Sequence, residues 1–311
     1  MTSVPTRTEP TISVVMNCLN GEKVVKAAIE SVYAQTFQDW EIVFLDNAST
    51  DATAAIAKAF DHRVRYFRNE QTVLLGRARN QALSKVSGEF VAFLDADDVW
   101  WPDKLERQLP LFDDPQTDFV FADTELRFAD SGVRVSYFDY HRYRPPRGRI
   151  LRDLLRHYAI PMLTTVIRTR ALRVMPQWFD DEFRVCDDFD FFMRLAHRCR
   201  CDYVDEMLAS CLLHEDAATV TLHRYAANEM RETLLKLERA DPAFRQSYRA
   251  EADGFLRRVD YTEGKSFWME GRRREAREAF LKHWPQPKFL ASYAAAWLPF
   301  PWVKRLQRRW R

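Results

Sequence analysis

Short apolar runs alternate with helical patterns over the first hundred residues, and this alternation constrains the fold more than any other feature. These runs, which are apolar except for Ser13, Glu41 and Arg65, are residues 12–16, 41–45, 64–67 and 90–94. Helical spacing of apolar residues is seen between them, in residues 24–33, 54–60 and 77–86. Strands that are apolar nearly throughout and separated by helices are typical of a parallel sheet covered on both faces. The pattern therefore predicts an α/β fold with a mainly parallel mixed sheet flanked by helices.

The remainder of the chain changes character near residue 226. Residues 119–123 and 133–137 have the pattern of strands, and residues 189–199 that of an amphipathic helix. From residue 226 onward the apolar residues recur at helical spacing almost throughout. We therefore expect one domain over residues 1–225, followed by a helical appendage over residues 226–311.

Two of the predicted strands stop at an acidic residue, Asp46 and Asp95. In sheets of this kind ligands bind beyond the carboxyl ends of the strands, so functional carboxylates are expected there. Asp95 also opens a cluster with Asp97 and Asp98. Three carboxylates this close repel one another unless a cation shares the site or water reaches it. Oxygen ligands favour Mg²⁺ or Mn²⁺; the alternative is a solvated acidic turn that caps the following helix.

Five motifs stand in order along the same part of the chain. They are residues 12–21, 28–36, 46–51, 76–80 and 93–102. In order and spacing they resemble the family 2 glycosyltransferases, which have the GT-A fold, and the resemblance covers about residues 10–225. It implies a GT-A catalytic domain over residues 1–225 that binds a nucleotide-diphospho-sugar donor.

The resemblance implies roles for five residues near the nucleotide. Asp46 resembles the aspartate that accepts the N3–H of a uracil-type base. Asn17 and Leu19 stand where the first loop of the family lines that base, although many relatives carry Tyr at the position of Leu19. Arg79 resembles the arginine near the nucleotide, and Asp95 is expected to face the ribose.

The resemblance also implies a metal ion, Mn²⁺ or Mg²⁺, bound by Asp97 and bridging the diphosphate. Such an ion would stabilise the charge that grows on the leaving group. His214 follows the acceptor region and is a second candidate ligand, with a surface histidine as the alternative. Asp98 is either a supporting group or another ligand. Trp100 either stacks on a sugar face or packs in the core.

A second acidic pair, Asp187 and Asp188, opens the helix predicted over residues 189–199. An inverting transfer needs a general base on the face of the sugar opposite the leaving group. The family supplies it from a Glu-Asp pair at a helix start, so the resemblance implies that Asp188 is the base, with Asp187 beside it. The alternative is electrostatic, because acidic residues stabilise helix N-termini without any catalytic role.

The last 86 residues carry 19 basic and 11 acidic side chains, although the whole chain has a net charge of only +2. Gly264, Gly271, Ala276 and Phe280 follow the spacing of a tetratricopeptide-like helical hairpin. Residues 288–311 hold six basic side chains, no acidic one and several Trp residues. Basic and aromatic residues together favour contact with an anionic membrane surface; the alternative is a solvated helix end whose Trp residues pack on the protein.

These observations predict a metal-dependent inverting glycosyltransferase. It would move a sugar from a UDP-linked donor to a hydroxyl group of a glycan or lipid-linked acceptor. The reaction would belong to surface glycan or polysaccharide synthesis. The alternative is a non-catalytic nucleotide-sugar-binding or scaffold protein on the same fold. A sugar-nucleotide pyrophosphorylase would need a Gly-rich basic loop after the first strand, and residues 17–21 do not provide one.

Composition limits where such a protein acts and what it binds. Residues 1–225 carry 28 basic and 34 acidic side chains, unlike the basic folded body of a general nucleic-acid binder, so no nucleic-acid partner is expected. No apolar signal-peptide core stands at the N-terminus, and no apolar run reaches the about 18 residues of a membrane span. Five scattered cysteines suit a reducing compartment. We therefore expect a cytoplasmic protein that is peripheral on the inner face of the membrane.

Overall fold

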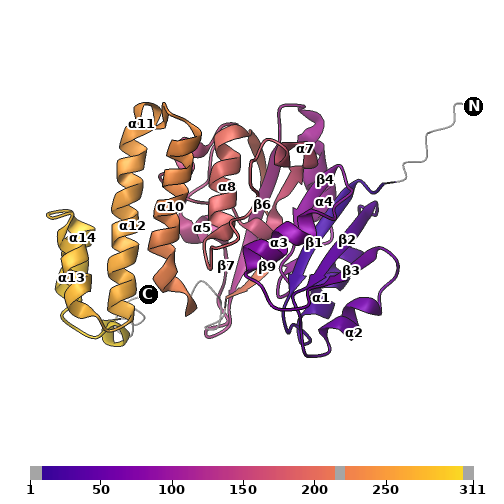
Figure 1. The fold of residues 1–311 in the computed structure, drawn as a ribbon, viewed down its shortest axis with the longest axis horizontal. Coiled ribbons are helices and arrows are strands. Elements are labelled where there is room, and N and C mark those ends of the chain that lie inside the picture. The colour runs from indigo at the N-terminus through magenta and orange to yellow at the C-terminus, as the bar shows by residue number, and fades with distance from the viewer. Residues whose placement is uncertain (1–8, 214–220, 304–311) are drawn as a thin grey trace, which may run out of the picture. The chain divides into compact units, whose positions relative to one another are not determined.

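The computed structural model describes residues 9–213 and 221–303 (Figure 1). The chain divides into two compact units. The first contains Met1–Phe183 and Asp187–Glu215, and the second contains Arg184–Cys186 and Asp216–Arg311. A three-residue segment of the second unit therefore interrupts the first, directly before the acidic pair at residues 187 and 188.

Four parallel strands form one half of the sheet in the first unit. They are β1 (Ile12–Cys18), β2 (Trp40–Asp46), β3 (Val64–Arg68) and β4 (Phe90–Phe93), in the spatial order β3-β2-β1-β4. The connecting helices are α1 (Val25–Tyr33), α2 (Thr53–Lys58) and α3 (Leu75–Leu83). All seven residues of β2 are buried, which explains why this strand is mostly apolar; its two acidic residues are Glu41 and Asp46.

The other half of the sheet is mostly antiparallel. It contains β8 (Val166–Arg168), β6 (Phe119–Phe128), β9 (Cys201–Leu213) and β5 (Val99–Trp100), with β7 (Arg134–Ser136) paired to β6. β8 is antiparallel to both β4 and β6, whereas β6 and β9 run parallel with register shifts near Ala122 and Asp123. The predicted α/β class with a mixed sheet flanked by helices is confirmed.

Short helices fill the connections of this half, and one longer helix, α8, carries the acidic pair. The short ones are α4 (Lys104–Gln108), η1 (Leu109–Asp113), α5 (Tyr137–His141), α6 (Leu151–Leu154), η2 (Met162–Thr164) and α7 (Thr169–Leu172). In α8 (Asp187–Arg198), the ring of Phe191 stacks on Phe179 at 4.4 Å and meets Phe93 of β4 edge-on at 6.0 Å. These buried rings fix α8 beside the end of β4, where Asp95 follows.

From residue 221 onward the described part of the second unit is mostly helical. The helices are α10 (His223–Ala240), α11 (Phe244–Ser247), α12 (Arg249–Met269), α13 (Arg273–Leu281) and α14 (Pro287–Ala295). Trp268, Phe280 and Phe289 belong to a core cluster of this unit. Across the described ranges, no helix combines the length and the apolar character needed to cross a membrane. The tetratricopeptide-like nature of the α12–α13 hairpin stays a prediction.

The α12–α13 hairpin depends on a close approach at Gly264. A Cβ atom added there would lie 2.6 Å from the ring of Phe280, whereas one added at Gly254 would meet only the end of Arg257 at 3.5 Å. We therefore expect Gly264→Ala to lower the free energy of unfolding by about 1–3 kcal/mol through overpacking. Gly254→Ala, the same change in the same helix, should raise it by about 0.5–1 kcal/mol through helix propensity. Urea denaturation of both variants checks this, and equal shifts for the two would contradict it.

Candidate functional site

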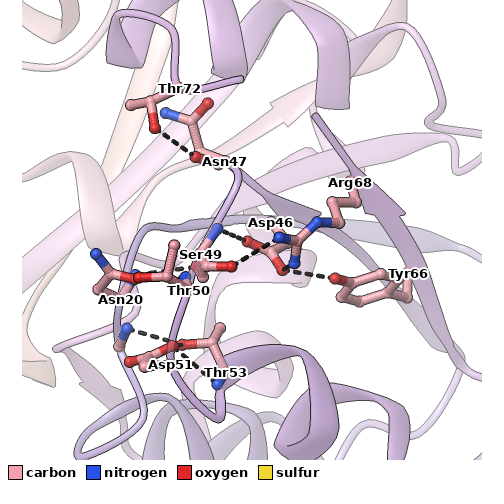
Figure 2. A network of polar contacts seen from close by, with 11 residues as sticks. Asn20, Asp46, Asn47, Ser49, Thr50, Asp51, Thr53, Tyr66, Arg68 and Thr72 are labelled. Carbon is pink, nitrogen blue, oxygen red and sulfur yellow. Dashed lines mark hydrogen bonds and ion pairs between the residues drawn. The ribbon is translucent and has the colours of Figure 1, made fainter. Parts of the chain in front are cut away.

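Asp46 ends β2 and its carboxylate is completely buried. Its Oδ2 accepts a hydrogen bond from the Tyr66 hydroxyl at 2.5 Å and one from Arg68 Nη1 at 2.9 Å, and Oδ1 accepts from the Ser49 backbone N–H at 2.7 Å (Figure 2). Burial by itself would raise the pKa of Asp46, but the hydrogen bonds from Tyr66 and Ser49 and the charge of Arg68 outweigh it and hold the pKa below its ordinary value. Asp46 is therefore an ionised acceptor held in one orientation.

The loops that follow β1 and β2 are joined by polar contacts beside Asp46 (Figure 2). Asn20 Oδ1 accepts from the Thr50 N–H at 2.8 Å, and the Asn20 N–H donates to Ser49 Oγ at 2.9 Å. Asn20 and Ala48 both have positive φ, at 55° and 67°, so the two loops turn sharply. The strand register places Cys18 opposite Asp46, which brings the first loop next to the buried carboxylate.

Two residues of the predicted base-binding set lie at this first loop. Asn17 is on β1 and pairs in register with Leu45, and its buried Oδ1 has no hydrogen-bond partner within the described part of the chain. Leu19 is exposed on the loop. The structure thus brings Asn17, Leu19 and Asp46 to one edge of the sheet. An acceptor without a partner and an exposed apolar side chain are groups that a ligand can cover.

A second cluster centres on Arg79 of α3, whose side chain is only 5% exposed. Its Nη1 lies 2.6 Å from Asp187 Oδ2, and its Nη2 lies 2.9 Å from Asp95 Oδ1. Burial opposes the charge of Arg79, but the carboxylates of Asp187 and Asp95 raise its pKa, so it stays a cation. This guanidinium therefore joins the carboxylate at the end of β4 to the first residue of α8.

Asp188 follows Asp187 in the first turn of α8 and keeps a partly exposed side chain. The surrounding protein nevertheless raises the pKa of Asp188 to about 6, chiefly by removing water and further by the charge of Asp187, while Arg79 acts in the opposite direction. A carboxylate with a pKa near 6 is ionised at neutral pH and is more basic than an ordinary aspartate. That is the property a general base needs, and the helix N-terminus also stabilises its charge.

The three carboxylates after β4 have different surroundings. Asp95 is partly exposed and bound to Arg79, and Asp97 is exposed. Asp98 is buried, and burial together with the charges of Asp95 and Asp97 raises its pKa, against hydrogen bonds from Cys211 and the Leu212 backbone. Asp98 therefore interacts with β9. Of its two predicted roles, this buried position favours a group that supports the site over a metal ligand.

Trp100 lies in the core with 2% of its surface exposed. Its Nε1 donates to the Leu163 carbonyl at 2.7 Å, and Lys104 Nζ lies 4.0 Å from its ring centroid. Of the two roles predicted for Trp100, core packing is the one that this position supports. The indole cannot stack on a sugar without leaving the core.

The donor set at Asp97 decides whether a divalent cation fits here. Within residues 9–213 and 221–303, no three His, Cys, Asp or Glu side chains are grouped as a metal site. Mg²⁺ and Mn²⁺ are, however, commonly held by one or two carboxylates together with substrate phosphates. Asp97 and the 40% exposed side chain of Asp95 offer oxygen donors of that kind, so they fit an ion shared with a diphosphate. His214 lies outside the described residues.

Two partners of Asp46 were not predicted from the sequence. Tyr66 and Arg68 are two residues apart on β3, so their side chains lie on the same face of the sheet. Arg68 is directly opposite Asp46 in the parallel register. The signal that could have found them is this pairing of β2 with β3. Tyr137 was missed as well: burial raises its pKa, and the charge of Asp188 adds to the effect, which places its hydroxyl in the electrostatic surroundings of the acidic pair.

Comparison with known proteins shows the family and the fold. Residues 13–173 match the model of glycosyl transferase family 2. The UDP-Glc:alpha-D-GlcNAc-diphosphoundecaprenol beta-1,3-glucosyltransferase WfgD of Escherichia coli is 32% identical over 157 residues, 50% of this chain and 59% of that protein. TuaG of Bacillus subtilis, named as a teichuronic acid biosynthesis glycosyltransferase, is 32% identical over 165 residues, 52% of this chain and 64% of that protein. The matched regions thus span less than two thirds of either relative.

Two solved structures are similar in fold. Residues 1–349 of TarS from S. aureus, in complex with UDP-GlcNAc, align with a TM-score of 0.68 at 20% identity, over 91% of this chain and 81% of that one. The mannosyltransferase PcManGT from Pyrobaculum calidifontis, in complex with GDP-Man and Mn²⁺, aligns with a TM-score of 0.62 at 19% identity, over 96% and 84%. The predicted GT-A fold is confirmed. With more than half of its length matched by the family model, the chain belongs to glycosyl transferase family 2.

Proposed function

We propose that this chain is a metal-dependent, inverting glycosyltransferase of surface glycan or polysaccharide synthesis. It moves a sugar from a UDP-linked donor to a hydroxyl of a glycan or lipid-linked acceptor. The observation that carries the proposal is the Arg79 cluster, because one buried cation joins Asp95, on the donor side, to Asp187, which precedes the base. Asp188, with its pKa near 6, stands next to that cluster.

The reaction follows from these positions. The acceptor oxygen forms a bond to the anomeric carbon while the bond from that carbon to the diphosphate oxygen breaks. The hydroxyl proton goes to Asp188, and the bonding electrons leave with the diphosphate. Asp97 would hold the divalent cation, which supplies positive charge to the leaving diphosphate. Attack opposite the leaving group turns an α-linked donor into a β-linked product.

The choice of UDP is supported by two observations. Asp46 is an ionised acceptor at the carboxyl edge of the sheet, and it has three protein contacts where a carboxylate can accept about four. Because Asp46 is completely buried, the N3–H of uracil would reach it only if Arg68, whose side chain is 44% exposed, moved aside. WfgD is named for UDP-Glc, and TarS was solved with UDP-GlcNAc. PcManGT was solved with GDP-Man, so competition between UDP and GDP distinguishes the two bases.

The pH dependence of sugar transfer tests the proposal. Asp188 must be deprotonated to accept the hydroxyl proton. Activity should therefore be lost as the pH falls below the raised pKa of Asp188. We expect kcat, measured with a UDP-sugar and Mn²⁺, to fall about tenfold per pH unit below pH 6 and to stay level above it. No transfer or donor hydrolysis across a broad set of donors and acceptors would favour the non-catalytic binding or scaffold alternative instead.

We also propose that the C-terminal helices contact an anionic membrane surface. Trp297, Leu298 and Trp302 are exposed, at 59%, 44% and 62%, while Phe289 and Val303 are buried in the unit's own core. Five basic residues follow within 304–311, a segment outside the described residues. Exposed Trp beside Lys and Arg suits the lipid headgroup region, and a lipid-linked acceptor would give this contact a purpose.

Vesicle sedimentation tests the membrane contact. Removing residues 304–311 takes away five positive charges and leaves the buried Phe289 and Val303 in place. We expect binding to vesicles of anionic lipid to fall at least about tenfold, since each basic residue near such a surface contributes about 1 kcal/mol. Trp297→Ser should weaken binding as well, whereas unchanged binding of the shortened chain, or equal binding to neutral vesicles, would refute the proposal.

A further inference from the structure

A buried carboxylate of β6, that of Asp123, holds the start of α5. It accepts hydrogen bonds from the Ser136 hydroxyl and, at 3.1 Å, from the Phe138 backbone N–H. Ser136 in turn caps the helix, because its Oγ accepts from the Asp139 N–H at 3.1 Å. Tyr137 stands between Ser136 and Phe138, so its backbone is fixed on both sides.

The helices α5 and α8 lie on the same face of β6. Phe119, Phe121 and Asp123 alternate along this strand, so their side chains lie on one face of the sheet. The ring centroid of Phe119 is 6.5 Å from that of Phe192 in α8, and the ring centroid of Phe121 is 6.4 Å from that of Phe138 in α5. α5 therefore packs on the face that also carries α8, whose first turn holds the acidic pair.

The start of α5 also lies level with the candidate site along the strands. β4 and β6 both run antiparallel to β8, and Ala92 and Val120 both stand opposite Val166. Asp95 and Asp123 each follow three residues later, and β4 and β6 run in the same direction, so Asp123 is level with Asp95. All of these residues belong to the first compact unit. α5 therefore begins at the edge of the sheet that carries Asp95.

The side chain of Tyr137 is partly exposed. Its ring centroid lies 6.2 Å from that of Phe138 and 4.3 Å from that of His141. Within residues 9–213 and 221–303, no group is hydrogen-bonded to the Tyr137 hydroxyl. Burial, together with the charges of Asp188 and Asp123, raises the pKa of Tyr137, so the phenol keeps its proton. The hydroxyl is therefore a neutral donor that a ligand can accept from.

We propose that Tyr137 determines acceptor specificity: its hydroxyl donates a hydrogen bond to an oxygen of a sugar acceptor, beside the hydroxyl that Asp188 deprotonates. This inference rests on the proposed role of Asp188 as base. The attacked oxygen itself is an unsuitable partner, because accepting a bond from Tyr137 would lower its nucleophilicity. A neighbouring acceptor oxygen remains, and binding it orients the acceptor without moving a proton. The base and the diphosphate of the donor are expected elsewhere, at Asp46 and Asp97.

Tyr137→Phe tests the inference, because it removes the hydroxyl and keeps the ring. Transfer is measured with UDP-sugars and Mn²⁺, and with phenyl and lipid-linked glycosides of common sugars as acceptors. With the glycoside that the parent chain uses best, we expect the KM for the acceptor to rise about 3- to 10-fold, the effect of losing one hydrogen bond between neutral groups. The KM for the donor should stay unchanged.

Monodeoxy derivatives of the same glycoside identify the oxygen that Tyr137 binds. The derivative that lacks this oxygen should raise the KM of the parent chain by a similar factor of about 3 to 10. It should have nearly the same KM with the parent chain and with Tyr137→Phe, because neither pair can form the bond. The other derivatives should keep the difference between the two enzymes.

Tyr140→Phe is the matched control, because Tyr140 is in the same helix but is 45% exposed, and its ring centroid lies 5.7 Å from that of Phe128. It should leave the KM for the acceptor unchanged. A parental acceptor KM for Tyr137→Phe, a raised KM for the donor, or a difference that persists with every deoxy derivative would overturn the inference. No turnover of any nucleotide-sugar by the parent chain would instead overturn the proposed function on which the inference rests.

Discussion

Replacing Asp188 with Asn should lower kcat about a thousandfold and leave donor affinity nearly unchanged. Asparagine keeps the shape of the side chain but cannot take the hydroxyl proton, and a positioned base contributes about 10²–10⁴ in rate. The carboxylate is suited to the task because its surroundings raise its pKa to about 6. Steady-state transfer assays, together with calorimetry of UDP-sugar binding in the presence of Mn²⁺, measure the two quantities separately.

Two further variants show whether this loss is specific to the base. Asp97→Asn should also abolish transfer, but through weaker metal-dependent donor binding, since Asp97 would hold the cation. Asp181→Asn removes an exposed carboxylate shortly before α8. Asp181 accepts a hydrogen bond from Asn80 at 2.8 Å, and the amide oxygen of asparagine can accept the same bond. It should retain the parental rate within about twofold. A parental kcat for Asp188→Asn would show that another group is the base.

Three strands of the first half of the sheet, β1, β2 and β4, could be predicted from the sequence because they are buried on both faces. The sequences of these strands are mostly apolar, and Asp46, the acidic residue that ends β2, lies at the edge of the sheet where the candidate site is found. β9 could not be recognised in this way. Its exposed Asp205 and Glu206 interrupt the apolar pattern, and its ladder with β6 changes register near Ala122. β5 has only two residues, too few for any periodicity.

The candidate site was predictable where a residue's place in the chain carries the information. Asp46 and Asp95 follow strands, and Asp188 opens a helix, so local patterns identify them. The partners of these residues are set by long-range packing instead. Arg79 and Asp187 are 108 residues apart in sequence, and Arg79 and Asp95 belong to different elements that pack together only in the folded chain. No local pattern records such contacts.

Replacing Arg79 with Met should lower the free energy of unfolding at pH 7 by about 3–5 kcal/mol, because it leaves the buried carboxylate of Asp187 without its cation. Arg79 is 5% exposed and bridges Asp187 and Asp95. Arg107 is the matched control: it also bridges two carboxylates, Asp103 and Glu206, but is 43% exposed. Arg107→Met should cost less than about 1 kcal/mol, because water screens surface ion pairs. Urea denaturation of both variants gives the comparison.

The pH dependence of this loss has a definite sign. Without the guanidinium, the pKa of Asp188 rises further, since the charge of Arg79 lowers it. A carboxylate whose pKa is raised in the folded state stabilises the protein below its unfolded pKa, and that contribution disappears as the pH rises through the folded value. The deficit of Arg79→Met should therefore shrink between pH 7 and pH 5. In residual transfer activity, the acid limb should move above pH 6. A deficit that grows on acidification, or equals that of Arg107→Met, would mean that Arg79 does not hold the acidic pair.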